Sequence, residues 1–266
     1  MELRSSELGV NRKTMDDIEG IISQNTGIAS GYYLLKIKLA KSMDPVMPGQ
    51  FVMLKIPDNE VFLRRPFSIY DYNQKVLTLM YKVVGKGTES LSRIKKSTGV
   101  SVLCPLGKGF SIQKRDAHIV VAGGIGIAGV HLLIKRLGTQ ATIYFGCNSA
   151  DELPLMGRAA KLSPFVSTLD GSYGFRGNVV QLFAQHMKTI EKKDIEVFAC
   201  GPESMLISLK ELLKKKRVPC QASFEERMAC GLGLCFGCVK KTVDEEEPYK
   251  RVCKEGPVFD LWQVCL

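Results

Sequence analysis

Residues 224–238 read FEERMACGLGLCFGC, and the chain continues to VCKEGPV at residues 252–258. This stretch contains four cysteines with the spacing C-x4-C-x2-C-x14-C, namely Cys230, Cys235, Cys238 and Cys253. Glycines between the first three cysteines allow a short loop to turn tightly and to aim backbone N–H groups at sulfur. The spacing is that of a plant-type [2Fe–2S] site with a shorter gap before the last ligand. We therefore predict that these four thiolates hold a [2Fe–2S] cluster.

Two other interpretations of the cysteines stay open at this point. A zinc site usually combines two C-x2-C pairs, and this stretch has only one. The thiols could also be free or disulfide-bonded, although a cytoplasmic chain is expected to keep its nine cysteines reduced or bound to metal. A [2Fe–2S] centre exchanges one electron at a time, so the rest of the chain should supply a group that exchanges electrons with it.

Composition indicates a globular protein of two domains with a small appendage. The chain has 266 residues, of which 45% are hydrophobic and 24% charged. No apolar run reaches the length of a membrane span, and the first residues lack the order of a signal peptide, so we expect a cytoplasmic protein without membrane contact. The net charge of +10 is scattered, which argues against nucleic-acid binding and fits anionic cofactors or an acidic partner.

The pattern of apolar residues divides the chain into four segments. Residues 1–15 are polar and are predicted to be an irregular arm. Residues 16–113 contain short alternating or β-branched runs, which predict an antiparallel β-barrel. In residues 114–217 apolar strands, among them residues 195–199, alternate with helical segments, among them residues 128–137, which predicts a parallel α/β domain. Residues 218–266 form the cluster domain, and the predicted class is α/β with an all-β domain.

A glycine motif in the second domain predicts a nucleotide site. Residues 120–129, VVAGGIGIAG, follow an apolar strand and open a helix. Gly123, Gly124 and Gly126 thus lie where a pyrophosphate would meet a helix N-terminus. The order G-G-x-G-x-A differs from the dinucleotide fingerprint G-x-G-x-x-G, so close packing of helix against strand is an alternative role for these glycines.

The barrel carries a second pair of motifs, which predict a flavin site. Residues 64–70, RRPFSIY, place a cation, an aromatic ring and a hydroxyl near one another on a strand. Arg65 and Phe67 share a face, where they could meet a phosphate and a ring. Gly87 and Thr88 follow one strand later and could offer amides and a hydroxyl to a pyrophosphate. An ordinary barrel strand followed by a glycine turn is the alternative.

These three motifs, in this order, resemble the ferredoxin reductase-like flavoproteins. The closest resemblance is to the electron-transfer subunits of NAD-dependent type B dihydroorotate dehydrogenases, and it covers residues 18–264. Further matching stretches are CPLGKGF at 104–110, DGSYG at 170–174, CGPESM at 200–205 and GPVFD at 256–260.

The resemblance implies roles for individual residues. For FAD it implies a phosphate contact from Arg65 and ring contacts from Phe67 and Ser68. The other residues implied to bind FAD are Pro66, Met80, Tyr81, Lys82, Gly87 and Thr88. Cys200, Gly201 and Pro202 would lie beside the nicotinamide, with Cys200 the candidate catalytic residue. NAD would contact Gly123, Gly124 and Gly126.

The resemblance also implies a function. Electrons would pass from the FMN of a dihydroorotate dehydrogenase catalytic subunit through the [2Fe–2S] cluster and FAD to NAD+, in de novo pyrimidine (UMP) biosynthesis. The partner would be that FMN-containing subunit, in a heterotetramer with two copies of each chain.

Two alternatives to this function stay open. The first is a NAD(P)H-oxidising subunit of a transhydrogenase, glutamate synthase-like or hydrogenase complex. Cys230 argues against a transhydrogenase, whose relatives commonly have Asp there. The second alternative is a non-catalytic, zinc-stabilised interaction module.

For the remaining titratable residues that we considered, we expect structural or surface roles. Glu225 and Glu226 precede the cluster loop and are expected to be solvated or to cap a turn. His118, His131 and His186 have no Cys or carboxylate neighbours at ligand spacing, so packing or surface positions are expected for them.

Overall fold

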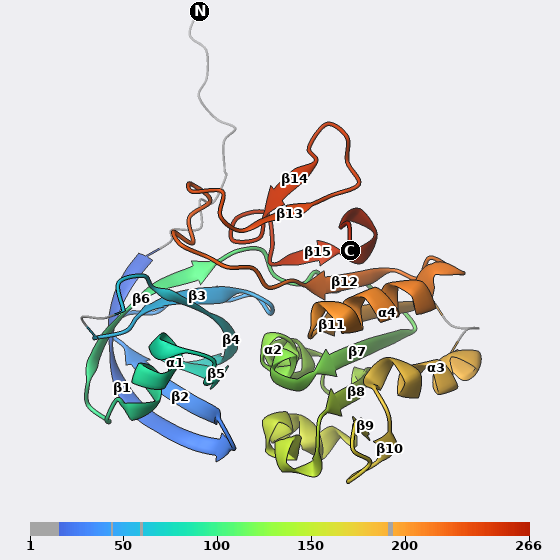
Figure 1. Cartoon of the computed structure of the whole chain (residues 1–266), viewed down its shortest axis with the longest axis horizontal. Coiled ribbons are helices and arrows are strands. Elements are labelled where there is room, and N and C mark those ends of the chain that lie inside the picture. Colours follow the sequence, from blue (N-terminus) through green and yellow to red (C-terminus); the bar gives the residue numbers. More distant parts are fainter. Residues whose placement is uncertain (1–15, 44, 59–60, 191–193) are drawn as a thin grey trace, which may run out of the picture.

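The computed structural model describes residues 16–43, 45–58, 61–190 and 194–266. A β-barrel lies on one side of the molecule and a parallel sheet with helices on the other, and the C-terminal segment lies above both (Figure 1). The predicted arm at residues 1–15 falls outside the described residues. The architecture confirms the predicted class, α/β with an antiparallel barrel.

Six antiparallel strands close the barrel in the order β1-β2-β5-β4-β3-β6. They are β1 (Asp16–Ala29), β2 (Tyr32–Leu39), β3 (Phe51–Lys55), β4 (Arg65–Asn73), β5 (Val76–Lys82) and β6 (Gly99–Leu106), and α1 (Lys86–Arg93) joins β5 to β6. Every second residue of β6 is buried, as expected when one face of a strand points into a barrel. Ile22, Leu35, Ile37 and Leu79 are fully buried there and form part of its core.

The second domain is built on a sheet of seven strands in the order β10-β9-β8-β7-β11-β12-β15. Its strands are β7 (Ala117–Gly123), β8 (Ala141–Cys147), β9 (Phe165–Thr168), β10 (Phe175–Arg176), β11 (Ile195–Cys200), β12 (Cys220–Ser223) and β15 (Val258–Asp260). All neighbouring pairs are parallel except β12 and β15. The central strand β11 is buried along its whole length, which is typical of a parallel sheet covered on both faces.

Helices cover both faces of this sheet. They are α2 (Ile127–Leu137), α3 (Val179–Ile190) and α4 (Glu203–Lys214), with 3₁₀ segments η1 (Gly124–Gly126), η2 (Gly138–Gln140) and η3 (Ala150–Leu162). Figure 1 shows α2 between the barrel and the sheet, and α3 and α4 on the far side. None of the helices in the described ranges is long and apolar enough to span a membrane.

The C-terminal segment is partly built into the sheet. Strands β12 and β15 belong to residues 218–266, the range predicted as a cluster domain, and both extend the α/β sheet. Between them lie the cysteine loop and the hairpin of β13 (Val239–Lys241) and β14 (Tyr249–Arg251), and η4 (Leu261–Gln263) follows β15. The cysteine loop is therefore anchored at both ends in the sheet that carries the glycine motif.

The two domains meet along α2 and β4. The ring of His131 on α2 stacks on Tyr70 of β4 at 3.7 Å between centroids, and its Nδ1 lies 3.0 Å from the Tyr70 carbonyl oxygen. Both side chains are buried, and His131 thus has a packing role, in line with its expected one. This contact places the helix that follows the glycine motif against the strand that carries the RPFS motif.

Candidate functional site

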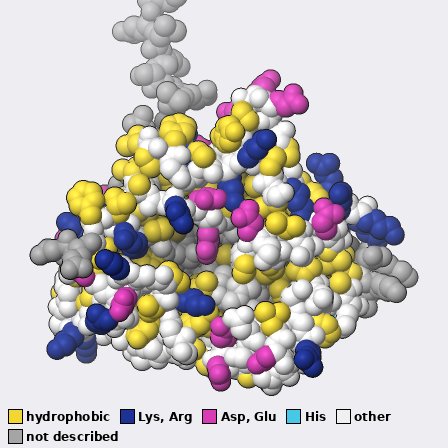
Figure 2. All heavy atoms as spheres, viewed as in Figure 1, with side chains coloured by type: hydrophobic (Ala, Val, Ile, Leu, Met, Phe, Trp, Pro, Cys, Tyr) yellow, Lys and Arg dark blue, Asp and Glu magenta, His cyan; other side chains and the backbone are white. Residues whose placement is uncertain are grey.

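A pocket of about 330 Å³ lies between the barrel, the start of α2 and the segment that follows β12. The surface of the molecule is hollowed at the centre of the face shown in Figure 2. Eight of the nine predicted FAD residues line this pocket, namely Arg65, Pro66, Phe67, Ser68, Met80, Tyr81, Lys82 and Thr88. Ile125 and Ala128 form its wall on the nucleotide side, and residues 223–228 contribute to the opposite wall. The structure thus brings the two barrel motifs to one cavity.

Arg65 and the start of α1 form a candidate phosphate site at this pocket. A Cβ on Gly87 would lie 2.8 Å from Arg65 Nε, so only glycine leaves room for the guanidinium against the helix start. Among the described residues Arg65 has no carboxylate partner, and its Nη1 donates to the Leu63 carbonyl. A guanidinium beside a helix N-terminus fits a phosphate. Thr88 Oγ1 already accepts from the Val84 and Gly85 amides, so its hydroxyl shapes the turn.

Aromatic residues form the floor of this cavity, which we call the flavin pocket after its predicted ligand. Phe67 meets the ring of Tyr81 edge to face at 5.8 Å, and Tyr33 stacks on the other side of Tyr81 at 5.4 Å. Tyr81 donates a hydrogen bond to Asn25, which itself donates to the Leu91 carbonyl. This packing fixes the rings in a largely apolar cavity, where a flat conjugated ligand would fit.

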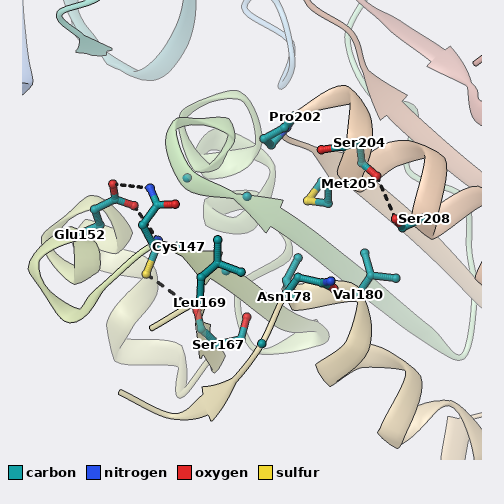
Figure 3. A pocket seen from close by; sticks show the side chains of 16 residues that line it. Cys147, Glu152, Ser167, Leu169, Asn178, Val180, Pro202, Ser204, Met205 and Ser208 are labelled. Atoms are coloured by element: carbon teal, nitrogen blue, oxygen red, sulfur yellow. Dashed lines mark hydrogen bonds between the residues drawn. The ribbon is translucent and has the colours of Figure 1, made fainter. Parts of the chain in front are cut away.

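A second pocket, of about 300 Å³, opens at the C-terminal ends of β7, β8 and β9. Figure 3 shows the side chains that surround it, which come from the strand ends, η3, α3 and α4. The predicted residues Gly123, Gly124 and Pro202 line it, together with the unpredicted Asn148, Glu152, Ser167, Asn178, Ser204 and Met205. Ligands of parallel sheets bind at this edge, which makes the pocket the candidate nucleotide site.

One buried polar group in the nucleotide pocket lacks a partner. Ser167 is fully buried at the end of β9, and its hydroxyl has no hydrogen-bond partner among the described residues. Such a group is costly unless something satisfies it. A polar ligand in this pocket could do so, and the donor set of the pocket therefore fits a nucleotide.

Two predicted glycines have a packing role. A Cβ on Gly126 would lie 2.3 Å from the carbonyl oxygen of Cys200, and one on Gly201 would lie 2.6 Å from the Met205 side chain. Neither residue lines either of the two pockets described above. These glycines let the start of α2 approach the end of β11 closely. Close packing of helix against strand is the alternative role expected from the sequence for the glycine motif. Gly123 and Gly124 combine this closeness with a position in the pocket wall.

Cys200 lies buried between the two pockets. A Cβ on Gly129 would lie 2.8 Å from Cys200 Sγ and 3.6 Å from Ser68 Oγ, so the thiol faces the flavin side of α2. Burial raises the pKa of Cys200 to about 12, and the nearby Glu225 adds to this effect. The thiol is therefore neutral at physiological pH, which does not favour nucleophilic chemistry, and Cys200 lines neither of the two pockets.

The four predicted cluster cysteines lie together on a loop and the turn after β14. Each sulfur accepts a backbone N–H. The donors are Leu232 to Cys230 at 3.3 Å, Gly233 to Cys253 at 3.1 Å, Gly237 to Cys235 at 3.5 Å and Cys253 to Cys238 at 3.4 Å. Amide donors stabilise thiolate sulfur, so this loop fits a metal–thiolate group.

The four thiols influence one another electrostatically, since Cys235 affects the pKa of Cys230, and Cys238 and Cys230 affect that of Cys253. No three Cys, His, Asp or Glu side chains of the described residues converge on a single point as ligands of one ion. Burial opposes ionisation of Cys230, but the amides of the loop outweigh it and lower the pKa of that thiol. Cys235 is exposed and Cys253 is buried, so the loop presents one of these two thiols to the surface.

Comparisons with known proteins identify the family to which this chain belongs. Residues 225–265 match the family model described as the iron-sulfur cluster binding domain of dihydroorotate dehydrogenase B. The dihydroorotate dehydrogenase B (NAD(+)) electron transfer subunit of Desulforamulus reducens is 36% identical over 247 residues, which are 89% of this chain and 94% of that protein. A homologue of this subunit in Aquifex aeolicus is 35% identical, over 94% of this chain and 99% of that protein. This chain belongs to the family of dihydroorotate dehydrogenase B electron transfer subunits.

Solved structures agree with this fold. The structure described as NADH-dependent reduced ferredoxin-NADP oxidoreductase superposes with a TM-score of 0.78 at 27% identity, covering 92% of this chain and 89% of that one. The FAD/NAD binding domain of a nitric oxide dioxygenase from Vibrio cholerae, at 19% identity and a TM-score of 0.64, shares the fold over 75% of this chain and 94% of that one. The family predicted from the sequence is confirmed.

Several residues that line the two pockets of this family member were not predicted from the sequence. Ser167 lies one residue before the end of β9, and the rule that ligands bind at the C-terminal edge of a parallel sheet could have found it. Glu225 was expected to be solvated or capping, yet it lines the flavin pocket, where desolvation raises its pKa. No local signal marks Glu225, since its position depends on the path of the chain after β12.

Proposed function

We propose that this chain carries electrons between the FMN of a dihydroorotate dehydrogenase catalytic subunit and NAD+. When bound, a [2Fe–2S] cluster supplies one-electron transfer and FAD converts between single electrons and hydride. The chain's own residues hold and orient these groups. Cys230, Cys235, Cys238 and Cys253 are the proposed cluster ligands, the pocket around Arg65 and Lys82 the proposed FAD site, and the pocket around Gly124 the proposed NAD site.

The order of the three sites in space carries this proposal. The flavin pocket is lined by Ile125 and Ala128, which belong to the glycine motif itself. Its opposite wall, residues 223–228, runs directly into the first cluster cysteine, Cys230. The cysteine loop also packs on the barrel, because a Cβ on Gly231 would lie 2.6 Å from the Met53 side chain. The flavin pocket thus lies between the thiols and the nucleotide pocket, as a route from cluster to nucleotide requires.

The family supports the assignment to pyrimidine biosynthesis and to NAD. Its relatives are named electron transfer subunits, which implies a separate catalytic subunit. We propose two copies of each chain in the complex and a cytoplasmic location. The family model that covers the cysteines describes an iron–sulfur domain, which favours the cluster over the zinc-stabilised module.

The test uses the complex purified under anaerobic conditions. Cys235→Ser should abolish dihydroorotate-dependent reduction of NAD+, while reduction of the bound FAD by NADH persists. Cys265→Ser is the matched control, because this thiol is half-exposed but lies outside the loop. Full linked activity in the Cys235 variant would refute the electron route. If the parent chain reduces NAD+ only together with a partner other than the dihydroorotate dehydrogenase catalytic subunit, the assignment to pyrimidine biosynthesis is refuted.

A further inference from the structure

A line of polar contacts joins the flavin pocket to the nucleotide pocket. Lys82 lines the flavin pocket at the end of β5, and Asn148 and Glu152 line the nucleotide pocket. Tyr32, at the start of β2, lies between them. In the β2–β5 ladder Tyr32 is the direct partner of Lys82, and the Lys82 ammonium lies 5.0 Å from the centroid of the Tyr32 ring. The barrel end of this line is thus fixed by strand register and by a cation–π contact.

The line crosses from the barrel to the α/β domain through one hydrogen bond. The Tyr32 hydroxyl donates to Glu152 Oε1 at 3.1 Å, although the two residues are 120 positions apart. Glu152 is held from its own side as well. Its carboxylate accepts the Asn148 backbone N–H at 3.1 Å and the Asn148 side-chain N–H at 2.9 Å. Figure 3 shows the contact between Glu152 and the neighbouring amide at the pocket edge.

The charges along this line are complementary. Burial opposes ionisation of Glu152, but hydrogen bonds from Asn148 and Tyr32 and the charge of Lys82 together lower its pKa. The carboxylate is therefore ionised between a cation on the flavin side and amide donors on the nucleotide side. Tyr32 is only 3% exposed, so water does not compete freely for its side chain. A hydrogen bond to a charged group in such a setting is stronger than one between neutral groups.

We propose that Lys82, Tyr32, Glu152 and Asn148 form a polar bridge that couples the two cofactor sites and positions the flavin against the nicotinamide. This inference deepens the proposed function and rests on it. The flavin would be held by the barrel and the nicotinamide by the α/β domain, and hydride passes only when the reacting atoms are roughly 3–3.5 Å apart. Tyr32 and Glu152 act as positioning residues across the domain boundary. A nucleotide that orders Asn148 and Glu152 also orders Tyr32 and Lys82, so each ligand lowers the cost of binding the other.

The first experiment measures this coupling without turnover. Release of FAD from the holoprotein is followed by flavin fluorescence after dilution, with and without saturating NAD+. In the parent chain NAD+ should slow FAD release by about fivefold or more, the lower end of typical couplings between sites. Tyr32→Phe keeps the ring over Lys82 but removes the hydroxyl, and it should bring the ratio close to one. Tyr33→Phe is the control, since the Tyr33 ring stacks on Tyr81 and its hydroxyl has no hydrogen bond among the described residues.

The second experiment separates positioning from affinity. Stopped-flow reduction of FAD by NADH gives a limiting rate and a half-saturating concentration. Tyr32→Phe should lower the limiting rate roughly two- to tenfold, the range for one lost hydrogen bond, with little change in half-saturation. Glu152→Ala should lower the rate at least as much. The double variant should be no slower than Glu152→Ala alone, because each single change already removes the hydrogen bond between Tyr32 and Glu152.

Each outcome decides between the possibilities. An NAD+ effect on FAD release that survives in Tyr32→Phe, or that is absent from the parent chain, would overturn the bridge. Rates that fall additively in the double variant would also overturn it, as would a Tyr32→Phe chain that is less stable but has an unchanged limiting rate. Flavin in the parent chain that NADH does not reduce would refute the proposed function itself, which is a different result from any of these.

Discussion

Replacing Gly126 by Ala tests whether the nucleotide site depends on the close approach of α2 to β11. The backbone of Gly126 is helical, with φ −58° and ψ −20°, so alanine suits its conformation and would by propensity gain up to about 1 kcal/mol. The obstacle is steric. The new Cβ would lie 2.3 Å from the Cys200 carbonyl oxygen and 2.7 Å from the Gly201 Cα, whereas ordinary contacts begin at 3.4 Å.

Those atoms belong to the backbone and cannot rotate away. The start of α2 must therefore move by about 1 Å from the end of β11, which carries Cys200 and leads into Gly201 and Pro202. Overpacking of this kind costs typically about 1–3 kcal/mol, which outweighs the propensity gain. A displacement of about 1 Å at a reacting centre can lower a rate about 100-fold. We expect a modest loss of stability and a much larger loss of hydride transfer.

The assay combines thermal unfolding of the holoprotein with stopped-flow reduction of FAD by NADH. The unfolding midpoint of Gly126→Ala should fall by several degrees, at about 2–4 °C per kcal/mol, and the limiting rate by about 10- to 100-fold. Gly99→Ala is the control, because a Cβ at Gly99 meets open space in the described structure. A Gly126→Ala chain with the stability and rate of the control would refute the reasoning.

Three further changes have definite expected results. Gly87→Ala places a Cβ 2.8 Å from Arg65 Nε and should weaken FAD binding roughly tenfold by displacing the guanidinium, measured by flavin fluorescence. Ser167→Ala removes a buried hydroxyl without a described partner, so stability should hold or rise while NADH affinity falls roughly two- to tenfold, measured by unfolding and calorimetry. Burial lowers the pKa of His131, so the folded state binds fewer protons there than the unfolded one, and stability should fall as the pH drops below about 6.5. His131→Phe keeps a ring on Tyr70 and should flatten that acid slope in denaturant unfolding; an unchanged slope would contradict the assignment.

The local features of the sequence predicted most of the elements. The helix predicted over residues 128–137 is α2, and the strand predicted over 195–199 is β11, each within one residue of the structure at either end. Such features depend on neighbouring residues, because apolar periodicity and backbone sterics act over a few positions. The spacing of the cysteines is local in the same sense, and it brought Cys230, Cys235 and Cys238 to one loop.

Contacts between distant segments could not be predicted in this way. The sequence shows that Tyr32 and Glu152 exist, but their hydrogen bond depends on how the barrel packs on η3. Glu225 enters the flavin pocket because β12 joins the α/β sheet and directs the chain back toward the barrel. These features depend on which surfaces of the barrel and the α/β domain pack together, although the residues concerned are more than a hundred positions apart in the chain. A short-range sequence pattern does not indicate such packing.

The sequence by itself therefore determined the fold class, the chemistry of the thiol loop and the two glycine-bearing motifs. Only the tertiary structure decided which glycines line a pocket and which, like Gly126, serve close packing. It also decided that the flavin pocket lies between the cysteine loop and the nucleotide pocket. The physical reason is that residue types fix what a site can bind, whereas the packing of whole elements fixes what lies beside it.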